Sequence, residues 1–371
     1  MTFDVGIIGL GAMGSAAAWA LSARGASVIG LEQFSLGHNR GSSHGRTRII
    51  RRIYSEGSLY TGLIEAAYEG WAAIGRQAGR DFLDKTGGLD ISLSQGGIFE
   101  DALAAAMQSG QPFEVLEGVD LETRFAMMDL GGRGRGVFNA DAGLIDSDEA
   151  TQWMRQRAVE QGARLLEETP VNGWSRTQRG FEIETDTARY PCRKLIIAAG
   201  AWVGELVPAL APVIIPERQV IGWYHADERF DDMPIFQLES EDRERFYVFP
   251  PHGGHGIKAG LYNHRRERGM EHVPPRGVDE ADLALLERGL SLCLPDIRPE
   301  PVETMECRFT NAPGDRFVIG TMPQDNDLII LSPCSGHGYK FTPAIGEIAA
   351  DLALEQETRV DIEPFSLQRV L

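Results

Sequence analysis

Three glycines near the N-terminus have the spacing of a turn that binds dinucleotides. Gly9, Gly11 and Gly14 form a Gly-x-Gly-x-x-Gly pattern between an apolar run and an alanine-rich run. Such a turn lets a pyrophosphate approach the backbone at the start of a helix. Glu32 ends the next apolar run, where a carboxylate accepts the ribose hydroxyls of adenosine and repels a 2′-phosphate. The pattern predicts FAD or NAD as cofactor, and a purely structural turn with a solvated Glu32 is the alternative.

A basic segment at residues 41–52 is the second candidate site. It holds four arginines and one histidine in a chain that is otherwise acidic. Charge runs of this kind are usually solvated faces. If the segment is helical, however, Arg48 and Arg51 share a face and can grip a carboxylate, with His44 in the loop before them.

A glycine-rich stretch at residues 332–341 is the third candidate site. The backbone N–H groups around Gly336 and Gly338 can cradle an anion, and Lys340 can add a point charge beside it. An ordinary turn before a helix has the same composition. The stretch therefore indicates a binding site only when it is considered together with the other two segments.

Length and composition set the class of protein. At roughly 150 residues per domain, 371 residues predict about two domains. The net charge of -18 argues against nucleic acid and anionic membranes as partners, because both are negatively charged. The four cysteines have no C-x-x-C spacing, which argues against a disulfide framework and a zinc site, and no metal is expected. No apolar stretch reaches about 18 residues, so we expect a cytoplasmic protein, most simply a monomer.

Periodicity predicts the elements that must position these residues. The first thirty residues predict a strand at 4–9, a helix at 13–23 and a strand at 27–31. A helix is expected from residue 58 to 74 with a stop at Gly75, and Asp146 with Glu149 has the spacing of a capping box for a helix reaching residue 161. The other expected elements are a buried strand at 194–199, strands at 219–224, 235–238, 245–249, 256–261, 317–319 and 328–331, and helices at 280–294 and 343–354.

Together the three segments resemble the sarcosine oxidase family of FAD-dependent amine oxidases, and the likeness covers essentially the whole chain. Its motifs are residues 41–51, Tyr247-Val248-Phe249-Pro250 followed by Gly256-Ile257-Lys258, Cys307, and residues 335–341. The fold class expected is α/β, with a Rossmann-type FAD-binding domain interleaved with a second domain built on a mainly antiparallel sheet. The FAD-binding domain is expected at residues 1–85, 145–212 and 312–371, and the substrate domain at 86–144 and 213–311.

The resemblance also implies a role for individual residues. Cys307 would carry a thioether to the 8α carbon of the flavin, the alternative being a small buried thiol. Lys258 would activate oxygen as a cation, and Arg51 with Lys340 would bind the substrate carboxylate. His44, Arg48 and Tyr247 would line the site beside the flavin. The residues expected to bind the cofactor are Gly9, Gly11, Gly14, Glu32, Ser42, Ser43, Cys307, Gly336, Gly338 and Lys340.

The function implied is oxidation of a secondary amino acid, N-methylated or cyclic. The substrate would give a hydride to the flavin, and reoxidation by oxygen would produce hydrogen peroxide and, from N-methyl substrates, formaldehyde. Cations around the site would keep the bound amine neutral, so that no dedicated base is needed. The alternatives are a flavin-dependent amino-acid dehydrogenase with another acceptor, an NAD-dependent dehydrogenase and a non-catalytic flavoprotein.

Three positions depart from the pattern of monomeric sarcosine oxidase. Phe309 stands where that enzyme has a tyrosine, Tyr262 where it has a histidine, and Cys334 where it has an aromatic residue. These differences leave the side chain of the substrate open.

Overall fold

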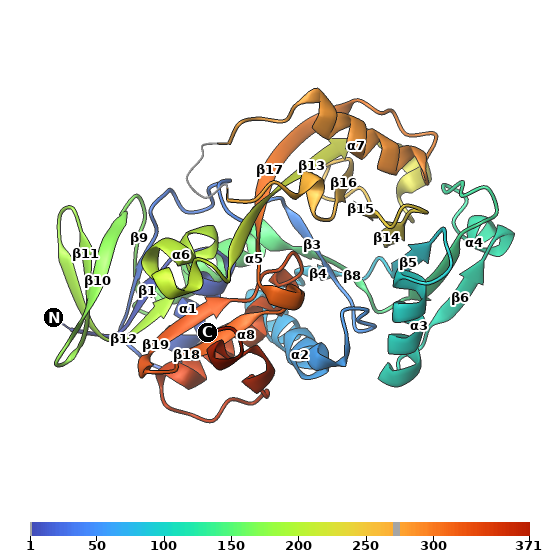
Figure 1. Ribbon diagram of the computed structural model, residues 1–371. Coiled ribbons are helices and arrows are strands. Elements are labelled where there is room, and N and C mark those ends of the chain that lie inside the picture. The colour runs from blue at the N-terminus through green and yellow to red at the C-terminus, as the bar shows by residue number, and fades with distance from the viewer. Residues whose placement is uncertain (1, 270–274) are drawn as a thin grey trace.

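The computed structural model describes residues 2–269 and 275–371 and contains two large β-sheets of eight strands each. In Figure 1 the first sheet lies at the left and the second at the upper right, with α7 (Glu280–Ser291) above the second. The second sheet takes its strands from residues 88–139 and 215–311, whereas the first uses residues before, between and after these ranges. Each sheet is therefore assembled from segments far apart in the sequence.

The first sheet has the parallel centre that alternating apolar strands and helices predict. Its parallel strands are, in spatial order, β9 (Arg164–Leu166), β2 (Val28–Leu31), β1 (Phe3–Ile8), β12 (Arg189–Ile197) and β19 (Asp325–Ser332). Antiparallel strands complete it, namely β10 (Val171–Thr177), β11 (Gly180–Thr185) and β18 (Val318–Met322). Central residues such as Ile7, Ile196 and Ile329 are fully buried, as expected for a parallel sheet covered on both faces.

Helices cover one face of the first sheet and join it in a single apolar cluster. They are α1 (Ala12–Ala23), α2 (Thr61–Ala78), α5 (Ser147–Glu160) and α8 (Thr342–Ala353). The alanines of α1 let α8 come close: a Cβ added at Gly346 would lie 2.7 Å from the carbonyl oxygen of Ala16. On the opposite face, Val203 of α6 (Val203–Leu206) and Leu210 pack against the strands.

The second sheet is antiparallel except for one parallel pair, β14 with β5. Its order is β17 (Pro301–Asn311), β13 (Ile215–Tyr224), β16 (Ile257–Leu261), β15 (Arg245–Phe249), β14 (Ile235–Glu239), β5 (Gly88–Ser92), β7 (Arg135–Asn139) and β6 (Glu114–Glu117). One face packs Phe236, Val248 and Ala259 against Leu286 and Leu290 of α7. Because side chains alternate along a strand, the residues between these face the other way.

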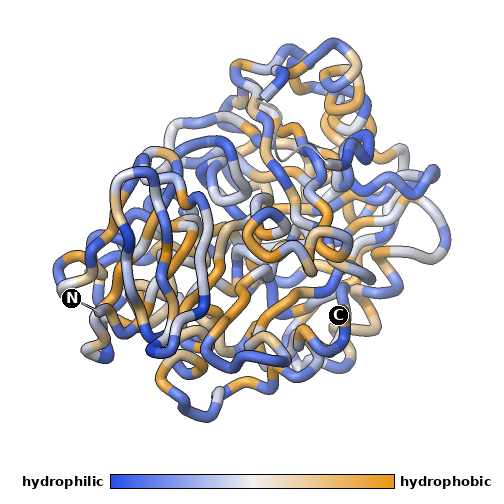
Figure 2. Tube along the Cα trace, turned by 60° about the vertical axis from the view of Figure 1, so that its left-hand side comes forward, coloured by the Kyte–Doolittle hydropathy of each residue, from blue (hydrophilic) through white to orange (hydrophobic). Residues whose placement is uncertain are grey.

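Smaller elements connect the two sheets. A three-stranded sheet consists of β3 (Thr47–Ile50), β8 (Gly143–Asp146) and β4 (Leu83–Asp84), and two helices, α3 (Ile98–Ser109) and α4 (Val119–Arg124), lie near the edge of the second sheet. Figure 2 shows hydrophobic stretches within the strands and hydrophilic stretches at the outer turns. Within the described ranges, no helix combines the length and the apolar character needed to cross a bilayer.

The predicted fold class is confirmed, with three local corrections. Residues 47–50 are a strand and not a helix, so Arg48 and Arg51 do not share a helical face. Helix α2 passes through Gly75 and ends at Ala78, where Gly79 adopts the left-handed conformation that ends a helix. Helix α5 begins as predicted, but the Asp146 carboxylate does not cap it, because this side chain instead lies 2.6 Å from His252 Nε2. The residue ranges of the two domains remain a prediction.

Candidate active site

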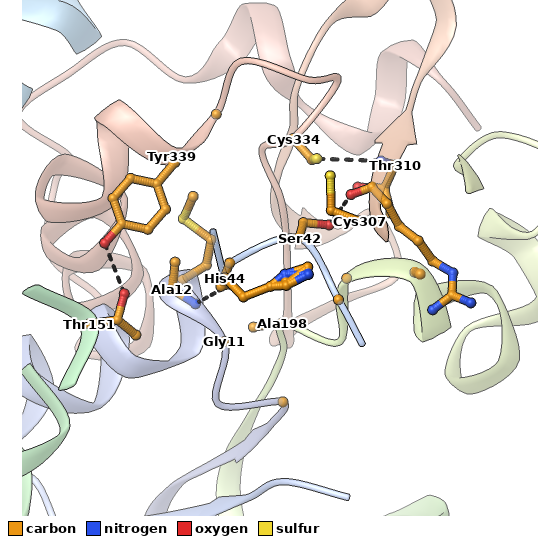
Figure 3. Close-up of a pocket in the computed structure, with 18 of the residues that line it drawn as sticks. Gly11, Ala12, Ser42, His44, Thr151, Ala198, Cys307, Thr310, Cys334 and Tyr339 are labelled. Carbon is orange, nitrogen blue, oxygen red and sulfur yellow. Dashed lines mark hydrogen bonds between the residues drawn. The ribbon is translucent and has the colours of Figure 1, made fainter. Parts of the chain in front are cut away.

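A cavity of about 710 Å³ is lined by residues from both large sheets and from the segment at residues 41–48. Figure 3 shows part of it, from Gly11 and Ala12 at the start of α1 to Cys307 and Cys334. Among the residues predicted for the site, all except Gly14 and Arg51 line this cavity. Folding therefore brings together side chains that the sequence separates by up to about 330 positions, from Gly9 to Lys340.

The glycine turn closes one end of the cavity. Gly9 has a φ of +92°, and a Cβ there would lie 2.5 Å from the carbonyl oxygen of Ala198. A Cβ at Gly14 would lie 1.9 Å from the carbonyl oxygen of Gly9, so α1 can start directly behind the turn only with glycine at both positions. Gly14 thus supports the turn from behind. The hydroxyl of Ser43 accepts a hydrogen bond of 2.9 Å from the N–H of Ala12, which ties the basic segment to the start of the helix.

Glu32 lies at the same end and is 6% exposed. Its carboxylate accepts hydrogen bonds from the N–H groups of Leu10 at 3.0 Å and Phe34 at 3.1 Å, and His38 Nε2 lies 3.4 Å away. Burial alone would raise the pKa of Glu32, but the contacts with His38 and Leu10 outweigh it and lower the pKa. A carboxylate oxygen has more than one acceptor position, so Glu32 remains able to accept from a ribose diol.

His44 and Arg48 lie in the middle of the cavity. His44 Nε2 is 3.0 Å from the carbonyl oxygens of both Asn39 and Glu306, which makes this nitrogen the donor. Burial, reinforced by Arg48, lowers the pKa of His44 to about 3, so the ring is neutral. Its Nδ1 is buried and has no partner within the described ranges, leaving one acceptor available to a ligand. Arg48 donates to the carbonyl oxygens of Thr47 at 2.8 Å and Ser42 at 2.7 Å.

Tyr247, Lys258 and Cys307 lie on the face of the second sheet that turns away from α7. Tyr247 pairs with Gly260 on the neighbouring strand, and Phe249 pairs with Lys258. A Cβ at position 260 would lie 2.2 Å from the Tyr247 hydroxyl, so Gly260 makes room for the ring. Two-residue alternation along β15, β16 and β17 therefore places three residues of the family motifs in one wall.

Lys258 is 3% exposed and its ammonium is held by backbone oxygens. Nζ donates to the carbonyl oxygens of Gly45 at 2.9 Å and Thr47 at 2.6 Å, and it lies 4.3 Å from the centre of the Phe249 ring. Burial and then the charge of Arg48 lower the pKa of Lys258 well below its usual value. The site thus contains a cation that gives up its proton unusually easily.

Cys307 is a buried free thiol, 8% exposed. Burial raises the pKa of Cys307, while the charges of Arg48 and Lys258 act in the opposite direction. Cys334 also lines the cavity, and its sulfur accepts a hydrogen bond of 3.3 Å from the N–H of Thr310 (Figure 3). Ser42 lies nearby and donates its hydroxyl hydrogen to the carbonyl oxygen of Arg308.

Arg51 is placed differently from what the sequence predicts. It is 4% exposed and lies behind the cavity wall, where it pairs with Asp90 and with Glu56, whose oxygens are 2.9 and 3.0 Å away. Ser55 accepts a further hydrogen bond of 3.1 Å from the same guanidinium. Two carboxylates already compensate this cation, so Glu56 must move before Arg51 can bind a substrate carboxylate.

Lys340 faces the cavity close to Arg51. Nζ donates to the carbonyl oxygen of His337 at 2.8 Å and lies 3.4 Å from the hydroxyl of Tyr54. Burial lowers the pKa of Lys340 to about 7, although the charge of Glu56 opposes this. Lys340 is therefore the cation that a carboxylate can reach without displacing an acid.

The glycine-rich stretch before α8 packs tightly beneath this end. A Cβ at Gly336 would lie 2.6 Å from the rings of both Phe309 and Tyr262, and a Cβ at Gly338 would lie 1.6 Å from the carbonyl oxygen of Pro333. These glycines let the turn approach the aromatic pair closely. The close packing at both positions explains the two glycines at least as well as anion binding does.

Several residues of the site were not predicted from the sequence. They are Tyr54, Glu56, Asp90, Gln237, Arg245 and His337. Tyr54 and Glu56 follow Arg51 within about five positions, so the sequence does show an acid near the arginine expected to bind a carboxylate. Asp90 and Gln237 carry no such signal, because they meet only through the parallel pairing of β5 with β14.

The residues at the glycine-turn end fit FAD. A glycine turn at the start of a helix suits a pyrophosphate, the Glu32 carboxylate suits an adenosine ribose, and the cavity continues from there to Cys307 and Lys340. The unpartnered Nδ1 of His44 lies along this path. The donors and acceptors therefore match a dinucleotide whose reactive end reaches the second sheet.

Comparisons with known proteins agree with this geometry. Residues 4–352 match the FAD dependent oxidoreductase family. The chain is 34% identical to monomeric sarcosine oxidase of Streptomyces avermitilis over 379 residues, covering 100% of this chain and 98% of that protein. It is 29% identical to N-methyl-L-tryptophan oxidase of Yersinia pestis over 386 residues, with 100% of both covered.

A solved structure has the same fold. It is that of NikD, an unusual amino acid oxidase essential for nikkomycin biosynthesis, with a TM-score of 0.86 and 23% identity over 98% of this chain and 97% of that chain. The chain therefore belongs to the FAD-dependent oxidoreductase family and has FAD as its cofactor.

Proposed function

We propose that the protein is an FAD-dependent oxidase of secondary amino acids, N-methylated or cyclic. The observation that carries the proposal is the common cavity wall of Tyr247, Lys258 and Cys307, which continues from the glycine turn and leads to Lys340. The names of the sequence relatives, monomeric sarcosine oxidase and N-methyl-L-tryptophan oxidase, support the same substrate class.

The residues that would hold FAD are the glycine turn with Ser43, Glu32 and the segment from Ser42 to Arg48. When bound, FAD accepts the two electrons that leave the substrate. We propose covalent attachment to Cys307, because it lies in the cavity wall with Tyr247 and Lys258, where the charges of Arg48 and Lys258 partly offset the burial that raises the pKa of its thiol. Cys334 lines the same cavity, and its sulfur accepts a hydrogen bond from the N–H of Thr310.

The chain's own side chains would prepare the substrate amine. Arg48 is a permanent cation beside the cavity, and Lys258 and Lys340 add positive charge in their protonated forms. This charge disfavours an ammonium ion, so it lowers the pKa of a bound amine and favours the neutral form that can be oxidised. Lys340 would hold the carboxylate, joined by Arg51 once Glu56 has moved away.

Lys258 would serve the second half of the reaction. Negative charge develops as oxygen is reduced, and a buried cation stabilises it. For an N-methyl substrate, one oxygen and one water are consumed and the demethylated amino acid, formaldehyde and hydrogen peroxide are formed. No further protein group has to change its covalent state.

The test is to mix purified holoenzyme with N-methyl, cyclic and primary amino acids without oxygen and to follow the flavin absorbance. We expect secondary amino acids to bleach the flavin and oxygen to restore it with one peroxide per substrate. If only an artificial acceptor restores the flavin absorbance, the protein is a dehydrogenase. If only NADH bleaches the flavin, it is a nicotinamide-dependent enzyme. If no secondary amino acid bleaches the flavin, the proposed substrate class is wrong.

A further inference from the structure

The cavity wall beyond Tyr247 contains a second cation that neither the carboxylate site nor the oxygen site uses. Arg245 stands two residues before Tyr247 on β15, so both side chains lie on the same face of the sheet. Both line the cavity. Burial raises the pKa of Tyr262 and of Asp90, and the charge of Arg245 lies near enough to both to oppose that rise. Its guanidinium therefore faces the substrate end of the cavity and not the nucleotide end.

Arg245 is half-buried and less tightly paired than Arg51, the buried arginine of this region. Its closest ion pair within the described ranges is with Glu239 Oε2 at 3.6 Å, whereas Arg51 is held by two carboxylates. The other oxygen of Glu239 already accepts a hydrogen bond of 2.7 Å from Arg243. The Arg245 side chain is 30% exposed, and a guanidinium has five N–H donors. Several donors of Arg245 are therefore available to a ligand.

Gln237 adds a second unsatisfied group to the same wall. It pairs with Tyr247 across β14 and β15, and it lines the cavity. Its Oε1 is buried and has no partner within the described part of the chain. An unpaired buried amide costs free energy unless a ligand completes it. Gln237 and Arg245 thus form a polar subsite on either side of Tyr247.

Two aromatic residues, Tyr262 and Phe309, lie at the substrate end of the cavity and provide no anionic partner for Arg245. Tyr262 and Phe309 have ring centres 5.4 Å apart, and the Tyr262 hydroxyl already donates to the carbonyl oxygen of Ser335 at 2.6 Å. Both residues depart from the pattern of monomeric sarcosine oxidase. Within the described ranges, the nearest carboxylate to the Arg245 donors is that of Glu239, at 3.6 Å.

We propose that Arg245 binds a carboxylate at the end of the substrate side chain, so that the preferred substrates are N-alkyl dicarboxylic amino acids. This inference rests on the proposed function and names its substrate class. Lys340 would hold the carboxylate next to the amine, and the planar guanidinium of Arg245 would hold the distal one. Gln237 would line the pocket beside it, with its unpaired Oε1 open to an N–H donor of the substrate.

The test compares N-methyl-L-glutamate with N-methyl-L-glutamine, which has the same length and a neutral end. We expect wild-type holoenzyme to favour the diacid in kcat/KM, and Arg245→Gln to reduce that preference by about 10- to 100-fold while activity on the amide changes little. Arg245→Lys should restore part of the preference, because it keeps the charge and loses the fork. The matched control is Arg243→Gln, since Arg243 also pairs with Glu239 but does not line the cavity.

Ligand binding gives a readout that does not depend on turnover. Glutarate and its monoamide, neither of which can be oxidised, are titrated into the holoenzyme while the flavin absorbance is followed. Tighter binding of glutarate that disappears in Arg245→Gln and persists in Arg243→Gln supports the subsite. Equal binding of the two ligands, or equal losses in the two variants, overturns it. If the wild-type enzyme has equal kcat/KM values for N-methylglutamine and N-methylglutamate, the proposed subsite is wrong and the proposed function stands. If no secondary amino acid is oxidised, the proposed function itself is wrong.

Discussion

Lys340 and Arg51 lie close together, but they differ in how readily they can bind a carboxylate. Arg51 is compensated by Asp90 and Glu56, whereas Lys340 donates to a carbonyl oxygen and lies near Tyr54. Burial raises the free energy of the ammonium, and no acid pairs with it directly in the described part of the chain. At the residue scale, the first contact of an incoming carboxylate is therefore assigned to Lys340.

This assignment predicts a pH dependence for carboxylate binding. The pKa of Lys340 is about 7, so its ammonium is lost as the pH rises through that value. The dissociation constant of acetate, which has no amine to titrate, should rise above pH 7 by up to about tenfold per pH unit. Flavin absorbance titrations between pH 6 and 9 measure it. Lys340→Met should bind acetate weakly with a flat profile in this range, and Lys194→Met, outside the cavity, should behave as wild type. An unchanged profile in Lys340→Met would assign the titration to another group.

The Cys307 assignment is tested by unfolding. A thioether survives acid precipitation, whereas noncovalent FAD is released, so we expect the yellow colour to stay with the wild-type pellet. Cys307→Ser should release it into the supernatant. Cys334→Ser is the matched control, because Cys334 lines the same cavity, and it should keep the colour. Release of all flavin from wild type would contradict the covalent link.

At the scale of elements, close contact between α1 and α8 places the glycine turn. A Cβ at Gly346 would lie 2.7 Å from the carbonyl oxygen of Ala16 and 2.9 Å from its Cβ. Backbone atoms cannot move away as a flexible side chain does. The alanine-rich composition of α1 is thus a packing requirement as well as a preference for helix.

Gly346→Ala should therefore destabilise the protein, although alanine favours helices. The expected loss is about 1–3 kcal/mol from overpacking, measured as a lower midpoint of thermal unfolding. Gly62→Ala is the matched control in α2, where the nearest atom to a new Cβ is Val360 Cγ1 at 3.4 Å. That change should be neutral or stabilise by up to about 1 kcal/mol. A stabilising Gly346→Ala would show that the helices can separate without cost.

At the scale of the whole molecule, the cavity gathers cations inside an acidic protein. The net charge is -18, yet Arg48, Lys258, Arg245 and Lys340 all line one space. Residues of both large sheets line the cavity, so bound FAD would contact both sheets and connect them.

Binding of FAD should accordingly stabilise the whole fold. In Cys307→Ser, where the cofactor is free to dissociate, FAD at about 100 times its dissociation constant should add about 2.7 kcal/mol. The midpoint of thermal unfolding should rise with FAD concentration. FMN, which lacks the adenosine that Glu32 and the glycine turn are expected to hold, should stabilise much less. Equal stabilisation by FMN would show that the nucleotide end does not bind FAD.

Features that depend only on residues close together in the chain could be predicted from the sequence. The Gly9, Gly11 and Gly14 turn with Glu32 needs only one strand, one turn and one helix, and the two-residue alternation of β15 and β16 follows from each strand alone. The local conformation of residues 47–51 was not determined in this way. The sequence Arg48-Ile49-Ile50-Arg51 suits a strand or a helix, and pairing of residues 47–50 with β8 selects the strand.

Which charges lie in contact depends on how the chain folds. Arg51 meets Asp90, which lies 39 positions away, through the arrangement of β3 and β5, and Arg245 reaches the cavity through its place on β15. Coulomb interactions depend on distance in space and on burial, and neither is written in the spacing of residues along the chain. For this reason the cofactor could be predicted from the sequence, whereas the compensation of Arg51 and the subsite at Arg245 required the fold.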